Sequence, residues 1–346
     1  MNSGILQSEI HQQPAVIREL LDAERDRVAQ IARELKGKFN YVVIAARGTS
    51  DNAARYAQYL FGAHNRLQVA LATPSLFSIY QQPPDLSGAL IVGISQSGQS
   101  PDIVSVLAEG EQQGRPTLAI TNDVDSPLAR AARFLIPLHA GPERAVAATK
   151  TYTASLAALA LLSCSLDDRP ARLDDLQRVP EFIEKTFPLL APSIERVERY
   201  RYMEQCAVIG RGFNYSTAFE IALKIKELNR LVCEPYSSAD FRHGPVATVS
   251  RGFPVFVLAI KGAIHSDLTG LLSELEQLGA ELLVISDDQE SLAQANLPLP
   301  LPPGLPEWLT PLVSVIPGQL FAMRLAVARG LDPDHPAGLT KVTETL

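Results

Sequence analysis

The stretch LIVGISQSGQSPDIV, residues 90–104, runs from an apolar segment through a small polar turn into a helical pattern. The segment LIVGI has no polar side chain, which is typical of a strand that is covered on both faces. Pro101 follows the turn and stands where proline is favoured, at the first position of a helix. We therefore predict a buried strand, a tight turn and a helix in direct succession, which is the unit of a parallel α/β sheet.

The rest of the chain alternates in the same way. An apolar stripe over 15–35 predicts an amphipathic opening helix with Pro14 directly before it. Helical patterns recur at 102–114 and 267–279. Short apolar runs that suit buried strands lie at 41–46, 89–94, 117–120, 206–210, 253–260 and 281–286. Strands that alternate with helices indicate a parallel α/β fold.

Three pairs of segments repeat at a nearly constant spacing of 164 or 165 residues. The pairs are YVVIAARG (41–48) with CAVIGRG (206–212), ALIVGI (89–94) with PVFVLA (254–259), and TLAITND (117–123) with LLVISDD (282–288). A constant spacing indicates two copies of one α/β domain. The expected organisation is a helical segment at 1–38, a first domain at 39–165, a helical linker at 166–200, a second domain at 201–330 and a tail at 331–346.

Composition excludes several classes of protein. The 346 residues are 46% hydrophobic and 20% charged, as in globular proteins, and the net charge of −7 argues against a nucleic-acid partner. Three cysteines without a C-x-x-C pair fit reduced thiols in the cytoplasm. Neither a secretory signal nor a long apolar run is visible, so we expect no membrane partner. The six histidines are scattered, so we expect no metal.

The turn after the strand at 89–94 is a candidate phosphate site. Free backbone N–H groups and the positive end of a helix meet there and attract an anion. Ser95, Gln96, Ser97 and Ser100 add uncharged donors. The alternative is that these serines only cap the helix.

A similar junction follows the strand at 41–46, where Gly48, Thr49 and Ser50 stand at the turn. Loops at the carboxyl ends of neighbouring parallel strands converge on one crevice, so both loops could bind one ligand. The alternative is a simple turn with Ser50 or Asp51 as the helix cap. The second copy has AIKGAIHSD (259–267) instead of a serine loop, so we expect one phosphate site per chain.

The segment STAFEIALKIKELNRL (216–231) places Glu220, Lys224 and Glu227 on one stripe of a predicted helix. The alternative is a solvent-exposed face of the helix whose charges form salt bridges with one another. His243 follows in a Gly-Pro turn with little helical character, and a lone loop histidine is more often structural than catalytic. Composition alone leaves both candidates open.

Six motifs together resemble one family. They are G-T-S (48–50), S-Q-S-G-x-S (95–100), V-A-x-T-K (146–150), E-x-A-L-K-x-K-E (220–227), H-G-P (243–245) and a lysine near the end of the chain (Lys341). Their order is similar to that of the sugar isomerase (SIS) family, most closely the isomerase half of glucosamine-6-phosphate synthase and its stand-alone deaminase and deglycase relatives. The resemblance implies two tandem doubly wound parallel-sheet domains of the flavodoxin-like type.

The resemblance also implies roles for single residues. Ser50, Ser95, Gln96, Ser97 and Ser100 would bind the sugar phosphate. Glu227 would move a proton between C1 and C2, with Lys224 near the developing enediolate and Glu220 as an ionic neighbour.

Three further roles come from the same resemblance. His243, donated by the partner chain of a homodimer, would open the sugar ring. Lys341 would close the site, and Val146 would line the sugar pocket. Such chemistry needs a base, donors for oxyanion charge and a phosphate anchor, but no cofactor.

The sequence departs from the synthase pattern in several places. It starts Met1-Asn2-Ser3 without a glutaminase segment, so we expect no ammonia release from glutamine. Arg47 replaces a small residue, Ala148 replaces a serine, and D-F-R-H-G-P (240–245) replaces E-L-K-H-G-P. These departures favour a stand-alone enzyme that converts glucosamine 6-phosphate to fructose 6-phosphate and ammonia. Fructosamine-6-phosphate deglycation, another amino-sugar phosphate isomerisation and a non-catalytic sugar-phosphate sensor remain alternatives.

Overall fold

The computed structural model describes residues 4–167 and 169–341, so the ends of the predicted opening segment and tail (1–3 and 342–346) lie outside the described residues. The chain divides into two compact units. Of the described residues, the first unit comprises 15–143, 150–167, 169–177 and 340–341, and the second unit comprises 4–14, 144–149 and 178–339. Each unit contains one parallel sheet, which confirms the predicted tandem α/β fold.

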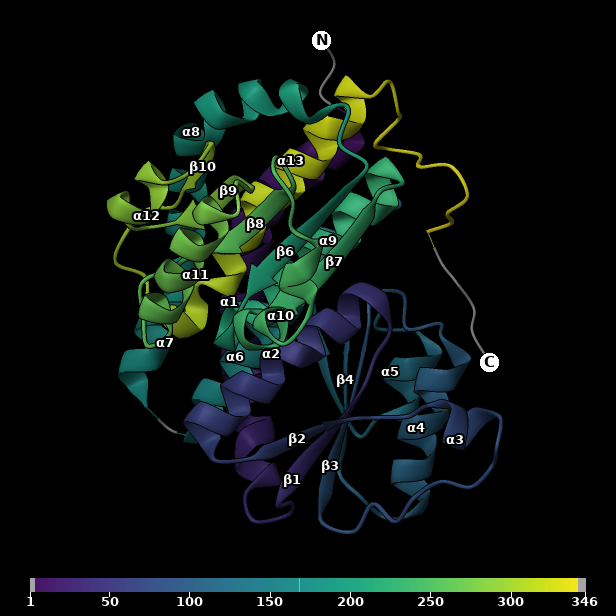
Figure 1. Ribbon diagram of the computed structural model, residues 1–346. Helices are drawn as coiled ribbons and strands as arrows, with labels where there is room; N and C mark the ends of the chain where they lie inside the picture. Colours follow the sequence, from purple (N-terminus) through teal and green to yellow (C-terminus); the bar gives the residue numbers. More distant parts are fainter. Residues whose placement is uncertain (1–3, 168, 342–346) are drawn as a thin grey trace. The chain divides into compact units, whose positions relative to one another are not determined.

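The first unit has the strand order β2-β1-β3-β4-β5, the doubly wound flavodoxin-like order (Figure 1). Its strands are β1 (Tyr41–Ala45), β2 (Gln68–Leu71), β3 (Ala89–Ser95), β4 (Thr117–Thr121) and β5 (Phe134–Pro137). Its helices are α2 (Gly48–Asn65), α3 (Ser75–Ser78), α4 (Pro101–Gln112), α5 (Pro127–Ala131), α6 (Lys150–Asp167) and α7 (Pro170–Gln177). All seven residues of β3 are buried, as a strand covered on both faces requires.

The second unit repeats this topology with the order β7-β6-β8-β9-β10. Its strands are β6 (Gln205–Gly210), β7 (Val232–Ser237), β8 (Pro254–Leu258), β9 (Glu281–Ser286) and β10 (Leu297–Pro300). Its helices are α8 (Val179–Glu195), α9 (Tyr215–Asn229), α10 (Ser238–Arg242), α11 (His265–Gln277), α12 (Gln289–Ala293) and α13 (Pro311–Ala328), with 3₁₀ turns at Arg196–Tyr200, Gly212–Asn214, Pro245–Thr248 and Glu307–Leu309.

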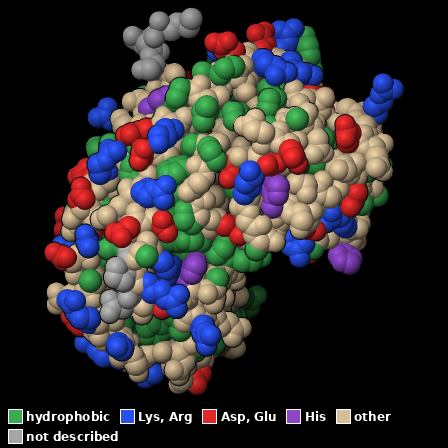
Figure 2. Space-filling model, turned by 90° about the vertical axis from the view of Figure 1, so that its left-hand side faces the viewer, with side chains coloured by type: hydrophobic (Ala, Val, Ile, Leu, Met, Phe, Trp, Pro, Cys, Tyr) green, Lys and Arg blue, Asp and Glu red, His purple; other side chains and the backbone are tan. Residues whose placement is uncertain are grey.

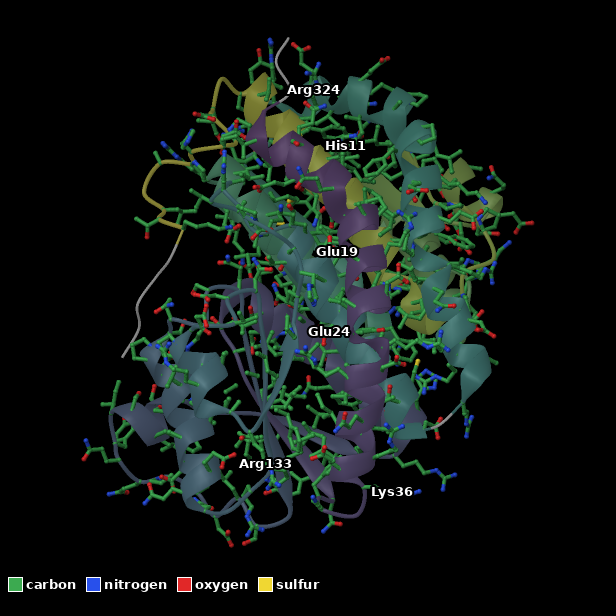
Figure 3. All side chains as sticks on the ribbon, turned by 180° about the vertical axis from the view of Figure 1, so that it is seen from behind. His11, Glu19, Glu24, Lys36, Arg133 and Arg324 are labelled. Carbon is green, nitrogen blue, oxygen red and sulfur yellow. The ribbon has the colours of Figure 1, made fainter. Side chains whose placement is uncertain are left out.

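The opening helix α1 (Ile5–Leu35) is longer than predicted, because Pro14 lies inside it and not before it. A proline inside a helix leaves the carbonyl of the residue four positions earlier without its N–H donor. Here the side-chain amide of Gln13 donates to that carbonyl, on Ile10, at 2.9 Å, and also to Gln319 at 2.8 Å. The side chain therefore replaces the missing backbone bond. Figure 3 labels His11, Glu19 and Glu24 along α1.

The segment before His243 is more regular than predicted. It forms the edge strand β7 and the short helix α10, and His243 is the residue directly after α10. Only Cys233 of β7 is buried, so the strand has no apolar run by which it could be recognised.

Helix α13 is long and apolar enough to cross a membrane by length and composition. Since 83% of it is buried inside the protein, it packs as a core helix. On the face drawn in Figure 2, Lys and Arg side chains are interspersed with Asp and Glu side chains.

Candidate active site

The predicted phosphate loops lie at the switch point of the first sheet. Strands β1 and β3 are hydrogen-bonded neighbours, paired from Tyr41 with Ala89 to Ala45 with Gly93. From β1 the chain passes through α2 to β2 on one side, and from β3 it passes through α4 to β4 on the other (Figure 1). Helices α2 and α4 therefore cover opposite faces of the sheet. In such sheets ligands bind in the crevice between the two loops.

The turn after β1 presents the N-terminus of α2. Gly48 has a φ of 52°, a left-handed conformation that glycine adopts without strain. The carbonyl of Arg47 accepts the N–H groups of Ser50 (3.0 Å) and Asp51 (3.3 Å). N–H groups earlier in the first turn have no acceptor within the helix, so this end of α2 suits an anion.

The serine loop after β3 is shaped by its own hydroxyls. The Oγ of Ser95 accepts the N–H of Gly98 at 3.1 Å, and the Oγ of Ser97 accepts the N–H of Gln99 at 3.3 Å. Gly98 has a φ of 63°, and a Cβ there would collide with the side chain of Ser126. The loop is therefore a compact turn that only glycine permits at this position.

Helix capping does not account for the polar residues of this loop. Ser100 is the N-cap residue of α4, yet its side chain makes no capping hydrogen bond. The side chains of Gln96 and Ser100 make no hydrogen bond to any of the described residues, 4–167 and 169–341. The hydroxyls of Ser95 and Ser97 act as acceptors here, so their protons remain available to a ligand.

The stripe on α9 is buried, so its interpretation as a solvated face is wrong. Glu220 and Lys224 have side-chain exposures of 0% and 1%, whereas that of Glu227 is 23%. The Nζ atom of Lys224 lies 2.6 Å from Oε2 of Glu227 and 3.4 Å from Oε1 of Glu220. One buried ammonium thus lies between two carboxylates, of which Glu227 is partly exposed and Glu220 is not.

The other predicted residues occupy different surroundings. His243 is exposed, and its ring makes no hydrogen bond with the described part of the chain. Val146 is half-buried in the second unit. In the first unit, Lys341 donates to Oε2 of Glu143 at 2.8 Å.

Glu143 is a residue that the sequence reasoning missed. Its side chain has an exposure of 0%, and besides Lys341 it accepts the N–H (3.1 Å) and the hydroxyl (2.8 Å) of Thr151 in the first turn of α6. Lys150 is the last residue of the V-A-x-T-K motif, and its ammonium donates to the carbonyl of Pro142 at 2.8 Å. Glu143 lies three residues before the V-A-x-T-K motif (146–150), but no periodicity marks it.

Comparison with known proteins identifies the family. The SIS domain model matches residues 38–164 and again 202–329. The chain belongs to the SIS domain family. The two matched SIS domains contain the two parallel sheets, which confirms the predicted duplication.

Individual relatives agree with this membership. The chain is 32% identical to the isomerizing glutamine–fructose-6-phosphate aminotransferase of Thermococcus kodakarensis over 96% of this chain and 56% of that protein, so it spans about half the length of this curated relative. A solved structure from Silicibacter pomeroyi DSS-3, provisionally named a phosphosugar isomerase, is 32% identical with a TM-score of 0.85 over 95% of this chain and 99% of that one. The C-terminal domain of the Francisella tularensis glucosamine-fructose-6-phosphate aminotransferase is 25% identical with a TM-score of 0.86, covering 96% and 98%.

The second SIS domain fills the position of the serine loop with its own carboxylates. The N–H of Ala263 donates to Glu307 at 2.8 Å, and the N–H of Lys261 donates to Asp287 at 2.8 Å. Two backbone donors of this loop are therefore already bound by carboxylates. This difference between the copies supports the prediction of one phosphate site per chain.

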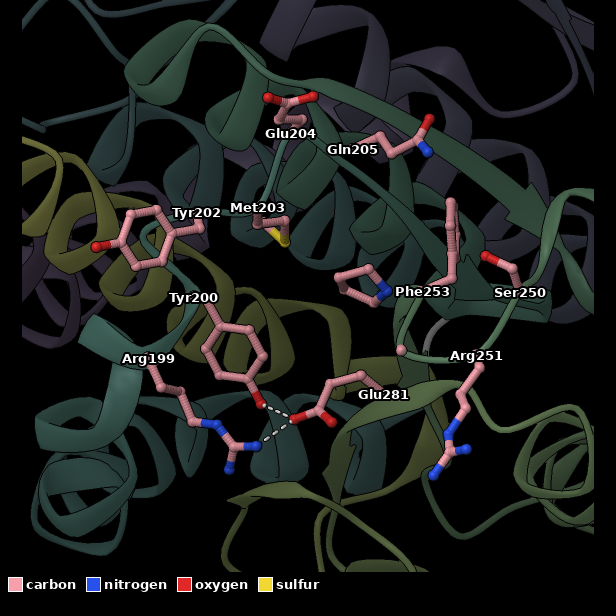
Figure 4. A pocket seen from close by; sticks show the side chains of 12 residues that line it. Arg199, Tyr200, Tyr202, Met203, Glu204, Gln205, Ser250, Arg251, Phe253 and Glu281 are labelled. Carbon is pink, nitrogen blue, oxygen red and sulfur yellow. Dashed lines mark hydrogen bonds and ion pairs between the residues drawn. The ribbon is translucent and has the colours of Figure 1, made fainter.

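A cavity of about 490 Å³ in the second unit lies away from these residues (Figure 4). Its lining includes the starts of β6, β8 and β9, at the sheet edge opposite to the carboxyl ends. Glu281 in this cavity accepts the hydroxyl of Tyr200 (2.9 Å) and pairs with Arg199 (2.8 Å). None of the predicted site residues lines it, and Glu281, one of its two acidic residues, is bound within the protein.

Proposed function

We propose that this chain is a phosphosugar aldose–ketose isomerase that acts on a hexosamine 6-phosphate and releases ammonia from glucosamine 6-phosphate. The observation that carries the proposal is the partly accessible Glu227 carboxylate, held 2.6 Å from the buried Lys224 ammonium. Membership of the SIS family supports it, as does the likeness to the isomerizing aminotransferase.

The proposed reaction starts from the open-chain sugar. Glu227 removes the proton on C2 while the C1 aldehyde oxygen gains one, which gives an enolamine. Return of a proton to C1, with loss of one from nitrogen, gives an imine at C2. Water hydrolyses this imine to fructose 6-phosphate and ammonia. Lys224 supplies positive charge near the developing negative oxygen.

The remaining residues bind and orient the substrate in this proposal. The loops at Ser50 and at Ser95–Ser100 anchor the phosphate, so that the reacting carbons are held in place. Val146 lines the sugar pocket, and Lys341 closes it. The phosphate loops belong to the first unit, and Glu227 belongs to the second.

The surroundings of the three thiols argue against their use in glutamine hydrolysis. Cys164, Cys206 and Cys233 are all buried. Burial raises the pKa of Cys164 to about 11 and raises the pKa of Cys233 well above its ordinary value. A neutral buried thiol is a poor nucleophile, so these cysteines do not suit glutamine hydrolysis.

We also propose a homodimer in which His243 serves the site of the partner subunit. The support is that His243 is exposed directly after α10 and that its ring is unengaged by the described residues. Co-refolding Glu227→Gln and His243→Asn chains tests this, because mixed dimers would contain one site with both residues intact. Recovery of activity is expected, and mixed dimers as inactive as each variant alone would refute the exchange.

A substrate panel tests the reaction itself. Ammonia, free amine and ketose phosphate are measured after incubation with glucosamine 6-phosphate, fructosamine 6-phosphates and unphosphorylated glucosamine. We expect ammonia from glucosamine 6-phosphate and none from glucosamine. Amine release from fructosamine 6-phosphates alone would indicate the deglycase, and tight binding without any turnover would indicate the sensor.

A further inference from the structure

A salt bridge links the two candidate phosphate loops of the first unit. Arg47 lies two residues after the end of β1 and is the N-cap residue of α2, whereas Asp102 lies in the first turn of α4. The Nε atom of Arg47 lies 2.8 Å from Oδ2 of Asp102, and Oδ1 of Asp102 accepts the N–H of Ile103 at 2.9 Å. The Asp102 side chain has an exposure of 0%. A carboxylate buried to this extent needs its cation, so the pair fixes both the guanidinium and the loops.

Arg47 uses only part of its hydrogen-bonding capacity in this pair. Its side chain is 47% exposed, and its Nη groups make no hydrogen bond with residues 4–167 or 169–341. A guanidinium carries a fork of N–H donors that matches phosphate geometry. Held by Nε alone, Arg47 therefore offers the rest of this fork beside the serine loop.

The second SIS domain contains an equivalent pair, but there the carboxylate has further partners. Arg211 follows β6 as Arg47 follows β1, and its Nη1 atom lies 3.0 Å from Oδ2 of Asp267 in the first turn of α11. Asp267 also accepts Arg242 at 2.9 Å and the hydroxyl of Ser238. The adjoining loop N–H groups are bound by carboxylates, as described above. The bridge is thus common to both domains, whereas free donors beside it occur in the first.

We propose that Arg47 contacts the phosphate of the substrate directly and that Asp102 is the positioning residue that holds it. This inference rests on the proposed function and adds a fixed positive charge to a site otherwise made of hydroxyl and backbone N–H donors. Arg47 stands where the resemblance to the synthase type leads us to expect a small residue, so the contact is a property of this chain. A site with a full charge discriminates more strongly between phosphorylated and unphosphorylated sugars than hydroxyls alone.

Calorimetric titration with fructose 6-phosphate and with inorganic phosphate tests this contact. In the full chain, Arg47→Gln is expected to weaken binding of fructose 6-phosphate by about ten-fold or more. Arg211→Gln breaks the equivalent bridge in the other domain and is the matched control, with binding expected within about two-fold of wild type. In steady-state assays with glucosamine 6-phosphate, Arg47→Gln should raise KM more than it lowers kcat.

The double variant Arg47→Gln/Asp102→Asn separates direct contact from neutralisation of Asp102. It removes the buried carboxylate together with its cation. It therefore leaves no unpaired buried charge that could unfold the protein, whereas Arg47→Gln alone leaves one. Binding should stay weak in the double variant; recovery to the wild-type affinity would overturn direct contact, as would unchanged affinity in Arg47→Gln. Wild type that binds both probes without turnover overturns the proposed function alone, and wild type that binds neither overturns both.

Discussion

On one face of α9, the ammonium of Lys224 lies 2.6 Å from the carboxylate of Glu227. The lysine is 1% exposed and the glutamate 23%, so the pair joins the interior of the second unit to its accessible surface. On its other side Lys224 lies 3.4 Å from the fully buried Glu220. Lys224 thus holds the Glu227 carboxylate on its buried side, and the opposite side of the carboxylate is accessible.

Replacing Glu227 by glutamine should remove the proposed base and little else. We expect kcat for glucosamine 6-phosphate to fall by about a hundred-fold or more, with KM changed far less. Because Glu227 is partly exposed, the loss in unfolding free energy should be about 1 kcal/mol or less. Steady-state kinetics and urea unfolding check both statements, and a variant with wild-type kcat would exclude Glu227 as the base.

Replacing Lys224 by methionine should instead destabilise the fold. It removes the cation that lies between two carboxylates in a buried environment, which costs about 3–5 kcal/mol. Urea unfolding of Lys224→Met beside Glu227→Gln provides the comparison. Equal stability of the two variants would mean that Lys224 does not stabilise the interior.

The contact between Lys341 and Glu143 predicts that these two residues act together. Lys341→Ala and Glu143→Gln should each lower kcat/KM on the order of ten-fold, because the first change removes the ammonium and the second removes the carboxylate that holds it in place. The double variant should be no worse than the more affected single variant, as expected for one shared interaction. Thr151→Val is the control, since it removes another bond of Glu143 and leaves Lys341; additive losses would refute the coupling.

The stability of the first unit should fall in mild acid because of His64. Burial and the nearby Arg172 lower the pKa of His64 to about 4, from an ordinary value of 6.5. As the pH falls below 6.5 the unfolded chain takes up this proton and the folded chain does not, so stability decreases from about pH 6.5 to about pH 4. Urea unfolding across this range should show a weaker pH dependence for His64→Gln than for wild type. Identical slopes would contradict the shift.

The central strands were predictable because they are covered on both faces and therefore read as unbroken apolar runs, as in β3. Edge strands were not, since β2 and β7 bury one residue each. Pro14 suggested a helix boundary, and only the side-chain bond from Gln13 to Ile10 shows how the helix continues past it.

In the candidate site, too, residues with a local sequence pattern were predictable and residues held by distant contacts were not. The spacing of Glu220, Lys224 and Glu227 put them on one face. The close packing of α9 against the distant α13, where a Cβ on Gly318 would collide with Ile221 of α9, has no local pattern in the sequence. Glu143 was not predictable because its partner Lys341 is 198 residues away in the sequence. Contacts at that separation leave no local pattern in the chain.

We propose that this chain converts glucosamine 6-phosphate to fructose 6-phosphate and ammonia. Phosphorus NMR of glucosamine 6-phosphate incubated with the purified protein, with ammonia assayed in the same tube, tests it most directly. We expect the fructose 6-phosphate signal to grow as the substrate signal declines, with one ammonia formed for each ketose phosphate. An unchanged substrate signal, or ketose phosphate without ammonia, would contradict it.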